Sequence, residues 1–170
     1  AKIVAVTGSN GKSTTVSLIQ HCLEAMGYKS ILAGNIGDAL CSYQIEKAGI
    51  DYVVLEVSSF QLDTIKSFKA DVAVLLNITP DHLDRYKDFD DYAQSKMRIF
   101  LNQAADDDAV ICADSGPILQ RIGQIKAKQH RYSLASAYPD VDAWMDNDFI
   151  QIGLRHRCSI NDLIIKGPHN

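Results

Sequence analysis

The sequence predicts an α/β fold: a doubly wound, mostly parallel sheet with helices on both faces and a small antiparallel β segment near the C-terminus. Its 170 residues suit one domain, because a chain of this length buries roughly 70% of its unfolded surface around a single core. Residues 2–7 form a β-branched apolar run that leads through a glycine loop into a helical pattern ending at Gly27. Residues 51–57 and 71–77 are almost continuously apolar, which is typical of parallel strands covered on both faces.

Further segments complete the predicted architecture. Residues 30–33 indicate a short strand, and a helix over residues 38–48 follows it. A long helix over residues 88–104 places its apolar side chains and Lys96 on one stripe, and residues 109–113 indicate another buried strand. Beyond residue 126 the segments are shorter and more polar, which predicts antiparallel β-structure at the sheet edge over residues 130–134, 143–145, 149–152 and 159–166.

The charge balance excludes some classes of partner. Seventeen basic and 21 acidic side chains give a formal net charge of -4, so no general attraction to nucleic acid or to an anionic membrane surface is expected. The longest apolar runs, such as residues 72–76, are far shorter than the ~20 residues that a bilayer requires. We therefore expect small-molecule substrates, and neither a nucleic acid nor a membrane as a partner.

The cysteines and the first residues of the chain give two further expectations. No pair of cysteines has CxxC spacing, and we expect reduced thiols in a cytoplasmic protein: Cys22, Cys41, Cys112 and Cys158. The chain enters its first strand pattern at once and shows no targeting features. This abrupt start suggests that the 170 residues belong to something longer.

The glycine loop of residues 8–13 has what a phosphate group requires. Its backbone N–H groups precede a helix N-terminus, Lys12 supplies positive charge, and the Ser13 hydroxyl is suited to Mg²⁺. The loop resembles a P-loop, although GxxGKS is shorter than the usual GxxxxGK[ST]. The alternative is a glycine turn that only joins a strand to a helix.

Glu56 interrupts an apolar strand pattern. A buried carboxylate is costly unless it is paired or bound to a cation, and a Mg²⁺ ion shared with Ser13 would offset that cost. The alternative is a carboxylate at the strand end that faces water or a neighbouring lysine. The loop that follows contains Ser58, Ser59 and Gln61, which either bind a substrate or cap the next helix.

Residues 77–86 gather Asp81, His82, Asp84 and Arg85 directly after a buried strand. Metal or phosphate contacts would suit this group, whereas a lone surface histidine is the commoner case. In an open α/β sheet, ligands bind beyond the carboxyl ends of the strands. We therefore expect four loops to converge at one edge: residues 8–12, 34–37, 56–61 and 77–85.

Lys96 lies on the apolar stripe of its predicted helix. Burial there would desolvate the ammonium and lower its pKa, and a neutral lysine is a nucleophile. The alternative is that the stem packs against the core while the charged head reaches solvent.

Six segments together resemble, in order and in spacing over the whole length, the central domain of the Mur ligases: Gly8-Ser9-Asn10-Gly11-Lys12-Ser13-Thr14, Gly34-Asn35-Ile36-Gly37, Glu56-Val57-Ser58-Ser59-Phe60-Gln61-Leu62, residues 77–86, Lys96 and Gly167-Pro168-His169-Asn170. The short GxxGKS is the form that this family uses. The second and third segments are most similar to the members that add D-glutamate to UDP-N-acetylmuramoyl-L-alanine. The resemblance implies an ATP-dependent amide-bond synthesis through an acyl phosphate, in peptidoglycan precursor synthesis.

The resemblance also implies roles for individual residues. It places two Mg²⁺ ions, the first on Ser13 and Glu56, with Thr14 as a further candidate. The second lies on His82 and on Lys96, which would be carbamylated by CO₂. Lys12, His82 and Lys96 would then act catalytically by positioning and charge neutralisation. ATP would contact Gly8, Ser9, Asn10, Gly11, Lys12, Ser13, Thr14 and, through its adenine, Asn170, while the muramoyl-alanine end of the substrate would face Asn35, Ser58, Ser59 and Gln61.

The resemblance finally implies that residues 1–170 are the single ATP-binding central domain of a three-domain, monomeric ligase. The N-terminal UDP-binding domain and the C-terminal domain would be absent from this chain, so the chain alone would be inactive. Two alternatives stay open: a folylpolyglutamate-synthase-like ligase and a non-catalytic P-loop nucleotide-binding module. A GTPase-like switch would require DxxG and NKxD motifs, which the sequence lacks.

Overall fold

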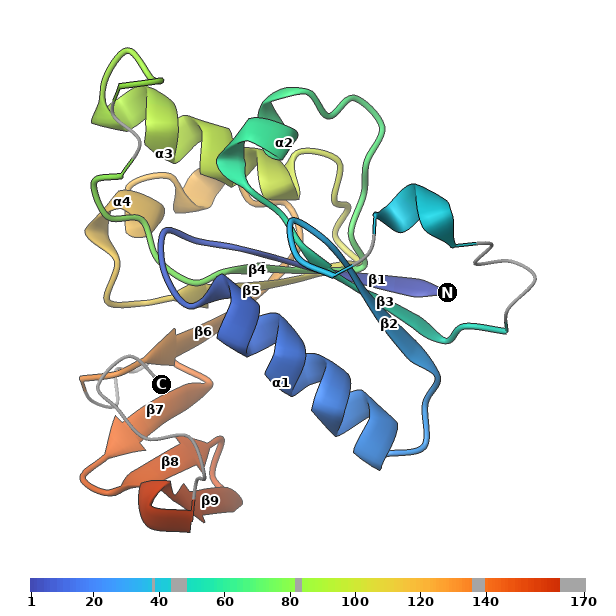
Figure 1. Cartoon of the computed structure of the whole chain (residues 1–170). Coiled ribbons are helices and arrows are strands. Elements are labelled where there is room, and N and C mark those ends of the chain that lie inside the picture. Colours follow the sequence, from blue (N-terminus) through green and yellow to red (C-terminus); the bar gives the residue numbers. More distant parts are fainter. Residues whose placement is uncertain (38, 44–48, 82–83, 136–139, 163–170) are drawn as a thin grey trace.

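The computed structural model describes residues 1–37, 39–43, 49–81, 84–135 and 140–162 (Figure 1). These residues form one nine-stranded sheet with the strand order β2-β3-β1-β4-β5-β6-β7-β8-β9. The strands are β1 Lys2–Thr7, β2 Ser30–Gly34, β3 Tyr52–Glu56, β4 Val72–Leu75, β5 Asp108–Cys112, β6 Lys128–Ser133, β7 Ala143–Asp146, β8 Phe149–Ile152 and β9 His156–Ser159.

The sheet is parallel from β2 through β7, and only the β7–β8 and β8–β9 pairs are antiparallel. The predicted fold class is confirmed, including the small antiparallel part near the C-terminus. From β1 the chain builds β2 and β3 on one side and then continues with β4 on the other. The strand order therefore reverses between β1 and β4, which is where open α/β sheets bind their ligands.

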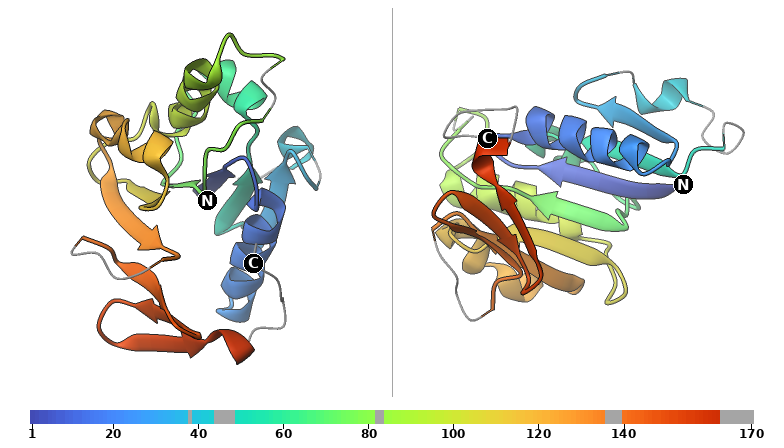
Figure 2. Two further views of the ribbon diagram at one scale, coloured as in Figure 1. Left: turned by 90° about the vertical axis from the view of Figure 1, so that its left-hand side faces the viewer. Right: turned by 90° about the horizontal axis from the view of Figure 1, so that it is seen from below.

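Helices cover both faces of the sheet, as the sequence predicted (Figures 1 and 2). Helix α1 Lys12–Ala25 lies on one face, and the other face carries α2 Ser59–Asp63, α3 Phe89–Met97 and α4 Gly116–Leu119. Short 3₁₀ turns extend or link these elements at Leu40–Ser42, Arg98–Phe100, Ile122–Gln124 and Ile160–Asp162. None of the described helices is long and apolar enough to cross a membrane.

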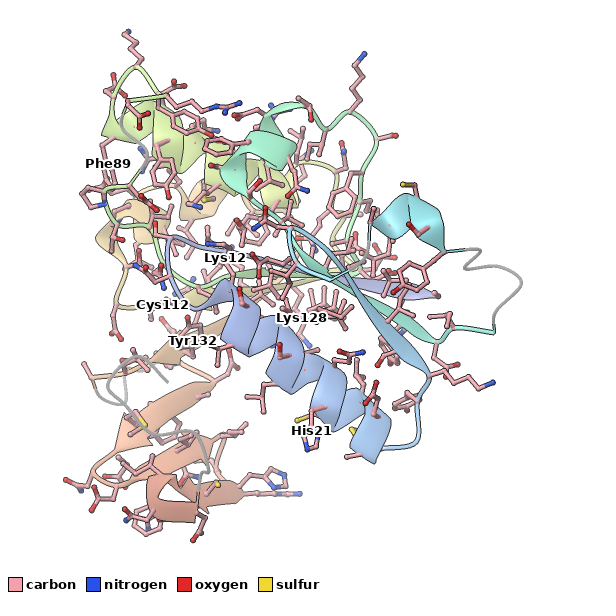
Figure 3. All side chains as sticks on the ribbon, viewed as in Figure 1. Lys12, His21, Phe89, Cys112, Lys128 and Tyr132 are labelled. Atoms are coloured by element: carbon pink, nitrogen blue, oxygen red, sulfur yellow. The ribbon has the colours of Figure 1, made fainter. Side chains whose placement is uncertain are left out.

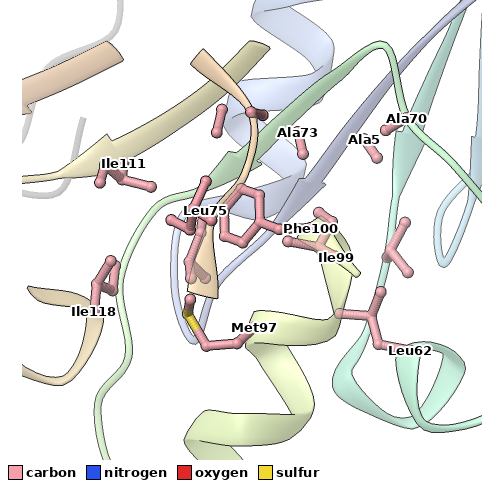
Figure 4. Close-up of a cluster of buried hydrophobic side chains, with 14 of the residues drawn as sticks. Ala5, Leu62, Ala70, Ala73, Leu75, Met97, Ile99, Phe100, Ile111 and Ile118 are labelled. Carbon is pink, nitrogen blue, oxygen red and sulfur yellow. The ribbon is translucent and has the colours of Figure 1, made fainter. Parts of the chain in front are cut away.

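Each face of the sheet has its own apolar cluster. The larger one packs β-strand residues such as Leu75 and Ile111 against Leu62 of α2, Met97 of α3 and Phe100 of the 3₁₀ turn that follows α3 (Figure 4). The smaller one packs side chains of β1, β3 and β4 against α1, and its buried members are Val6, Val16, Val54 and Val74. Successive residues of β3 alternate between the two clusters: Val54 belongs to the smaller cluster under α1, and Leu55 belongs to the larger cluster on the opposite face.

The apolar stripe predicted for residues 88–104 is confirmed. Its members beyond the first turn are at most 3% exposed: Tyr92, Ala93, Lys96, Ile99, Phe100 and Gln103. The helix itself is shorter than predicted, since α3 ends at Met97 and the 3₁₀ turn Arg98–Phe100 follows. At the start of this turn, the side chain of Arg98 donates hydrogen bonds to the carbonyls of Leu62 and Ile65.

Three predictions about secondary structure were wrong. Of the expected helix over residues 38–48, the described residues 39–43 form only the turn Leu40–Ser42 and an extended Tyr43; residues 38 and 44–48 lie outside the described part. Residues 130–134, expected to be antiparallel, belong to β6, which pairs in parallel with β5, and β7 also pairs in parallel with β6. Because β6 is only half-buried, its polar side chains gave it the pattern of an edge strand.

The last predicted strand, over residues 159–166, also differs. Strand β9 lies earlier, at His156–Ser159, and the turn Ile160–Asp162 follows it. Residues 163–166 lie outside the described part of the chain.

Candidate functional site

The glycine loop joins β1 to α1 at the carboxyl edge of the sheet. Gly11 is the N-cap of α1, no side chain caps the helix, and its first turn has no acidic residue. No hydrogen bond among the described residues uses the backbone N–H groups of residues 11–14. Unpaired N–H groups and the helix dipole together favour an anion at this position.

Two lysine side chains meet on the loop. The Nζ atom of Lys12 donates to the carbonyl oxygens of Gly8 at 2.9 Å and Ser9 at 3.0 Å. The Nζ atom of Lys96, which comes from α3, donates to the same Gly8 carbonyl at 2.9 Å. Figure 3 shows Lys12 at the start of α1, beside the carboxyl ends of the strands. The loop therefore carries two cationic groups beside its open N–H groups.

Lys96 is buried, with 2% of its surface exposed, and its Nζ atom lies 4.8 Å from the centre of the Tyr92 ring. Burial lowers the pKa of Lys96 from 10.5 to about 8; the charge of Lys12 lowers it further and Asp81 partly opposes this change. Of the two interpretations that the sequence left open, the structure supports the buried amine and not the charged head in solvent.

The Glu56 carboxylate is also buried, with 2% of its surface exposed. Ser13 Oγ donates to Oε2 at 2.7 Å and Asn35 Nδ2 donates to Oε1 at 2.8 Å. The ion pairs found among the described residues do not include Glu56, so the alternative of a lysine partner has no support there. A buried anion with two neutral donors, beside a hydroxyl that can also act as a ligand, fits one divalent cation with oxygen ligands.

The second predicted metal site depends on His82, which lies outside the described residues, as does Asn170. Within the described part of the chain, no group of three or more His, Cys, Asp or Glu side chains could hold a metal ion. The observed geometry therefore provides protein ligands for one cation at Ser13 and Glu56. Thr14 is exposed one residue further along α1.

Gly34 allows β2 to approach Glu56. Its φ is 105°, and a Cβ atom at this position would lie 2.3 Å from the Glu56 carbonyl oxygen, so only glycine fits. This close approach lets the backbone N–H of Asn35 donate to the same carbonyl at 2.8 Å. Asn35, predicted to face a substrate, therefore also holds the carboxylate of Glu56 in place.

Ser58 and Gln61 form a capping box at the start of α2. The Gln61 backbone N–H donates to Ser58 Oγ at 3.3 Å, and the Ser58 backbone N–H donates to Gln61 Oε1 at 2.9 Å. Ser59 is buried, and its carbonyl accepts a bond from Ser95 Oγ at 3.1 Å. The helix-capping role considered for this loop is confirmed, while contacts of its side chains with a substrate stay a prediction.

The four polar loops meet at one edge, as predicted, within the described residues. Ser13 and Asn35 both contact Glu56, and Ser9 contacts Thr79: Thr79 N–H donates to Ser9 Oγ at 3.0 Å. No sequence pattern indicated an individual role for Asn77, Thr79 or Tyr92, although all three bond the glycine loop. The only signal for Asn77 was its place as the first polar residue after a buried strand.

These features define a doubly wound α/β domain with a P-loop-like glycine loop between its first strand and its first helix. The family model described as "Mur ligase middle domain" matches residues 6–158. The chain therefore belongs to the Mur ligase family.

The similar proteins agree with this assignment. The chain is 41% identical over 169 residues to the UDP-N-acetylmuramoylalanine–D-glutamate ligase of Fusobacterium nucleatum, covering 99% of this chain and 38% of that protein. It is 43% identical over 177 residues to the enzyme of the same name from Cytophaga hutchinsonii, covering 100% of this chain and 39% of that protein. The chain thus spans less than two fifths of the length of these relatives.

Two solved structures share the fold. A UDP-N-acetylmuramoyl-L-alanyl-D-glutamate–2,6-diaminopimelate ligase matches with a TM-score of 0.70 and 25% identity, over 86% of this chain and 34% of that one. A bifunctional folylpolyglutamate synthase/dihydrofolate synthase with Mn, AMPPNP and L-glutamate bound matches with a TM-score of 0.65 and 20% identity, over 93% of this chain and 48% of that one. The second likeness concerns the fold alone.

The buried amine predicts an unusual dependence of stability on pH. At pH 7 the Lys96 ammonium is charged in the folded and the unfolded chain, so the folded state bears the full cost of burial. Between pH 8 and 10.5 the folded chain loses this proton first, and the free energy of unfolding gains up to about 3 kcal/mol. We expect Lys96→Met to lack this rise when urea unfolding is measured at pH 7 and pH 10 in CO₂-free buffer. The exposed control Lys2→Met should keep it; parallel curves for wild type and Lys96→Met would contradict the assignment.

Proposed function

We propose that this chain is the ATP-binding middle part of a three-domain ligase that adds D-glutamate to UDP-N-acetylmuramoyl-L-alanine in peptidoglycan precursor synthesis. The single observation that carries the proposal is the N-terminus of α1, where the backbone N–H groups have no acceptor among the described residues. Lys12 is the first residue of this helix, and the Ser13–Glu56 pair lies next to it. The substrates follow from the relatives, which are named for this reaction at about 40% identity over the whole chain. The folylpolyglutamate alternative has support only at the level of fold.

In the proposed reaction, the terminal phosphoryl group of ATP passes to the carboxylate of the L-alanyl substrate. The amine of D-glutamate then attacks the acyl phosphate, and the products are an amide, phosphate and ADP. The N–H groups of residues 11–14 and the Lys12 ammonium would hold the phosphate groups and neutralise the charge that develops during transfer. For this role Lys12 would exchange its present bonds with the Gly8 and Ser9 carbonyls for bonds with phosphate oxygens.

Magnesium would supply charge neutralisation between the phosphate groups. We assign Ser13 and Glu56 to one ion, because the buried carboxylate and the hydroxyl already contact each other; Thr14 is a further candidate. For a second ion we assign His82 and Lys96. Solved relatives of this fold were obtained with ADP or with AMPPNP and Mn, which supports a nucleotide with a divalent metal.

Lys96 would act as a metal ligand after carbamylation. A neutral amine adds to the carbon of CO₂, an N–C bond forms and one proton leaves, so a buried cation becomes an anionic oxygen ligand suited to a hard metal. The lowered pKa of about 8 makes a neutral amine available near physiological pH. This modification would also remove the cost of holding an ammonium in the core.

The remaining assignments follow from the family resemblance. We assign Asn35, Ser58, Ser59 and Gln61 to the muramoyl-alanine end of the substrate and Asn170 to the adenine. We also propose a monomer that works in the cytoplasm.

Replacing Lys12 tests the assignment of the glycine loop. In the full-length ligase we expect Lys12→Ala to lower ATP turnover at least about 100-fold, because a charge that stabilises the transferred phosphoryl group is lost. Turnover is measured as substrate-dependent phosphate release. Lys2→Ala, at an exposed position on the same strand–loop–helix unit, serves as the control and should stay within twofold of wild type. Near-normal turnover of Lys12→Ala would refute the loop's phosphate-binding role.

The isolated chain tests the proposed division into domains. We expect the 170 residues alone to release no phosphate that depends on both UDP-N-acetylmuramoyl-L-alanine and D-glutamate, because ligation requires both reactants to be held in line. The same assay on the full-length ligase is the positive control. Phosphate release by the chain alone that requires both substrates would show that the other domains are dispensable.

Carbamylation is directly observable. With ¹³C-labelled bicarbonate at pH 8, we expect the protein to show a ¹³C carbamate resonance that is missing from Lys96→Met and present in Lys2→Met. The reason is that Lys96 has a pKa lowered to about 8, so about half of its amine is neutral at that pH. Identical spectra for wild type and Lys96→Met would exclude carbamylation of Lys96.

A further inference from the structure

The side chain of Asn77 is bonded to both backbone groups of a glycine-loop residue. Its Oδ1 atom accepts the N–H of Asn10 at 2.9 Å, and its Nδ2 atom donates to the Asn10 carbonyl at 3.1 Å. The two residues are 67 positions apart in the sequence. A carboxamide has the same donor and acceptor as a peptide group, so Asn77 binds Asn10 as a neighbouring strand would.

The position of Asn77 in the sheet explains this contact. The last Cα pair of β1 and β4 is Thr7 with Leu75. Beyond it, the ladder continues with Leu76 N–H donating to the Thr7 carbonyl at 3.0 Å and Ser9 N–H donating to the Asn77 carbonyl at 3.1 Å. Beyond this point the glycine loop turns toward α1 and leaves the segment that follows β4. The side chain of Asn77 spans this separation and adds one more step to the parallel ladder.

A second set of bonds fixes the residue before Asn10. The buried Ser9 hydroxyl donates to the Thr79 carbonyl at 3.0 Å and accepts the Thr79 N–H at 3.0 Å. The exposed Asn10 side chain donates to Thr79 Oγ1 at 3.3 Å. We call residues Asn77 and Thr79 with these bonds the loop clamp.

The clamp divides the glycine loop into two halves. The N–H groups of Ser9 and Asn10 already donate to the backbone carbonyl and to the side chain of Asn77. The N–H groups of residues 11–14 have no acceptor among the described residues. The clamp therefore decides which N–H groups an anion can reach, and it fixes their direction before any ligand binds.

We infer that Asn77 is a positioning residue for nucleotide binding: it holds the first half of the glycine loop on the end of β4, so that the second half presents its N–H groups to phosphate. This inference rests on the proposed function, because it takes the anion to be the phosphate chain of ATP. Preorganisation of this kind improves affinity by removing the cost of ordering the loop on binding.

The test compares two asparagines in the full-length ligase. Asn77→Ala should raise the KM for ATP and the Kd for MgADP about tenfold, the loss expected when two bonds that order a binding loop disappear. Its kcat at saturating ATP should change less than about threefold, since ground state and transition state use the same N–H groups.

Asn102→Ala is the matched control. The Asn102 carboxamide also makes two bonds to backbone, to the carbonyls of Lys66 and Phe68 at 2.9 and 2.8 Å, but it does not touch the glycine loop. It should lower the urea midpoint by a similar amount while leaving the KM for ATP and the Kd for MgADP within twofold of wild type. Equal nucleotide affinities in the two variants would overturn the inference.

Amide hydrogen exchange of the wild type tests the clamp without any variant. In the nucleotide-free protein, the Asn10 amide should be protected like that of Leu76, whereas the amides of Gly11 and Ser13 should exchange quickly until MgADP is added. An Asn10 amide that exchanges as fast as that of Gly11 would overturn the clamp. Wild type that binds no MgADP would instead refute the proposed function and the nucleotide role of Asn77, while protection at Asn10 would still establish the contact.

Discussion

The parallel pairing of β1 with both β3 and β4 is the constraint on which the site depends. The register places Val6 beside Glu56 and Thr7 beside Leu75, so the loops after all three strands start at the same height. A slip of one residue in β3 would move Glu56 to the opposite face of the sheet, away from Ser13. The slip would also move each buried apolar residue of β3 from one hydrophobic cluster to the other, so the packing of both clusters opposes it. Core packing therefore sets the positions of the polar groups at the edge.

The glycine loop is approached by opposite charges from the two faces of the sheet. Glu56 shares its face with Val54 and reaches Ser13 on α1, whereas Lys96 comes from α3 on the other face and reaches the Gly8 carbonyl. Each side chain is 2% exposed, and burial of a charge without a full ionic partner lowers stability. A bound cation beside Glu56 and an anionic modification of Lys96 would relieve both costs. The buried Glu56 carboxylate and the buried Lys96 amine, which destabilise the protein without ligands, would thus favour the state with a bound metal and a modified lysine.

The sequence was sufficient for the parts of the molecule that depend on local pattern. Continuous apolar runs predicted β3 and β4, and the helical stripe placed Lys96 on the buried side of its helix without deciding whether its amine reaches solvent. It was insufficient where the tertiary environment decides: β6 continues the parallel sheet beside β5, although most of its residues are polar and half-buried. The contact of Asn77 with Asn10 joins residues far apart in the chain, so no local pattern could indicate it. Likewise, the bond between Asn35 and Glu56 depends on the close approach at Gly34.

Tyr92 links the loop clamp to the buried lysine. Its hydroxyl lies 3.1 Å from Ser9 Oγ, which also binds Thr79, and its ring faces the Lys96 ammonium. The neighbouring Tyr86 ring lies 5.2 Å from that of Tyr92, and its hydroxyl donates to Asp63 at the end of α2. The hydrogen bonds of Ser9 with Thr79 and Tyr92 restrict the conformations of the glycine loop, so a ligand would bind to a site that is already ordered. Ordering of the glycine loop is thus a property of the fold, and the charges of a bound nucleotide and metal would act on groups that the protein has already placed.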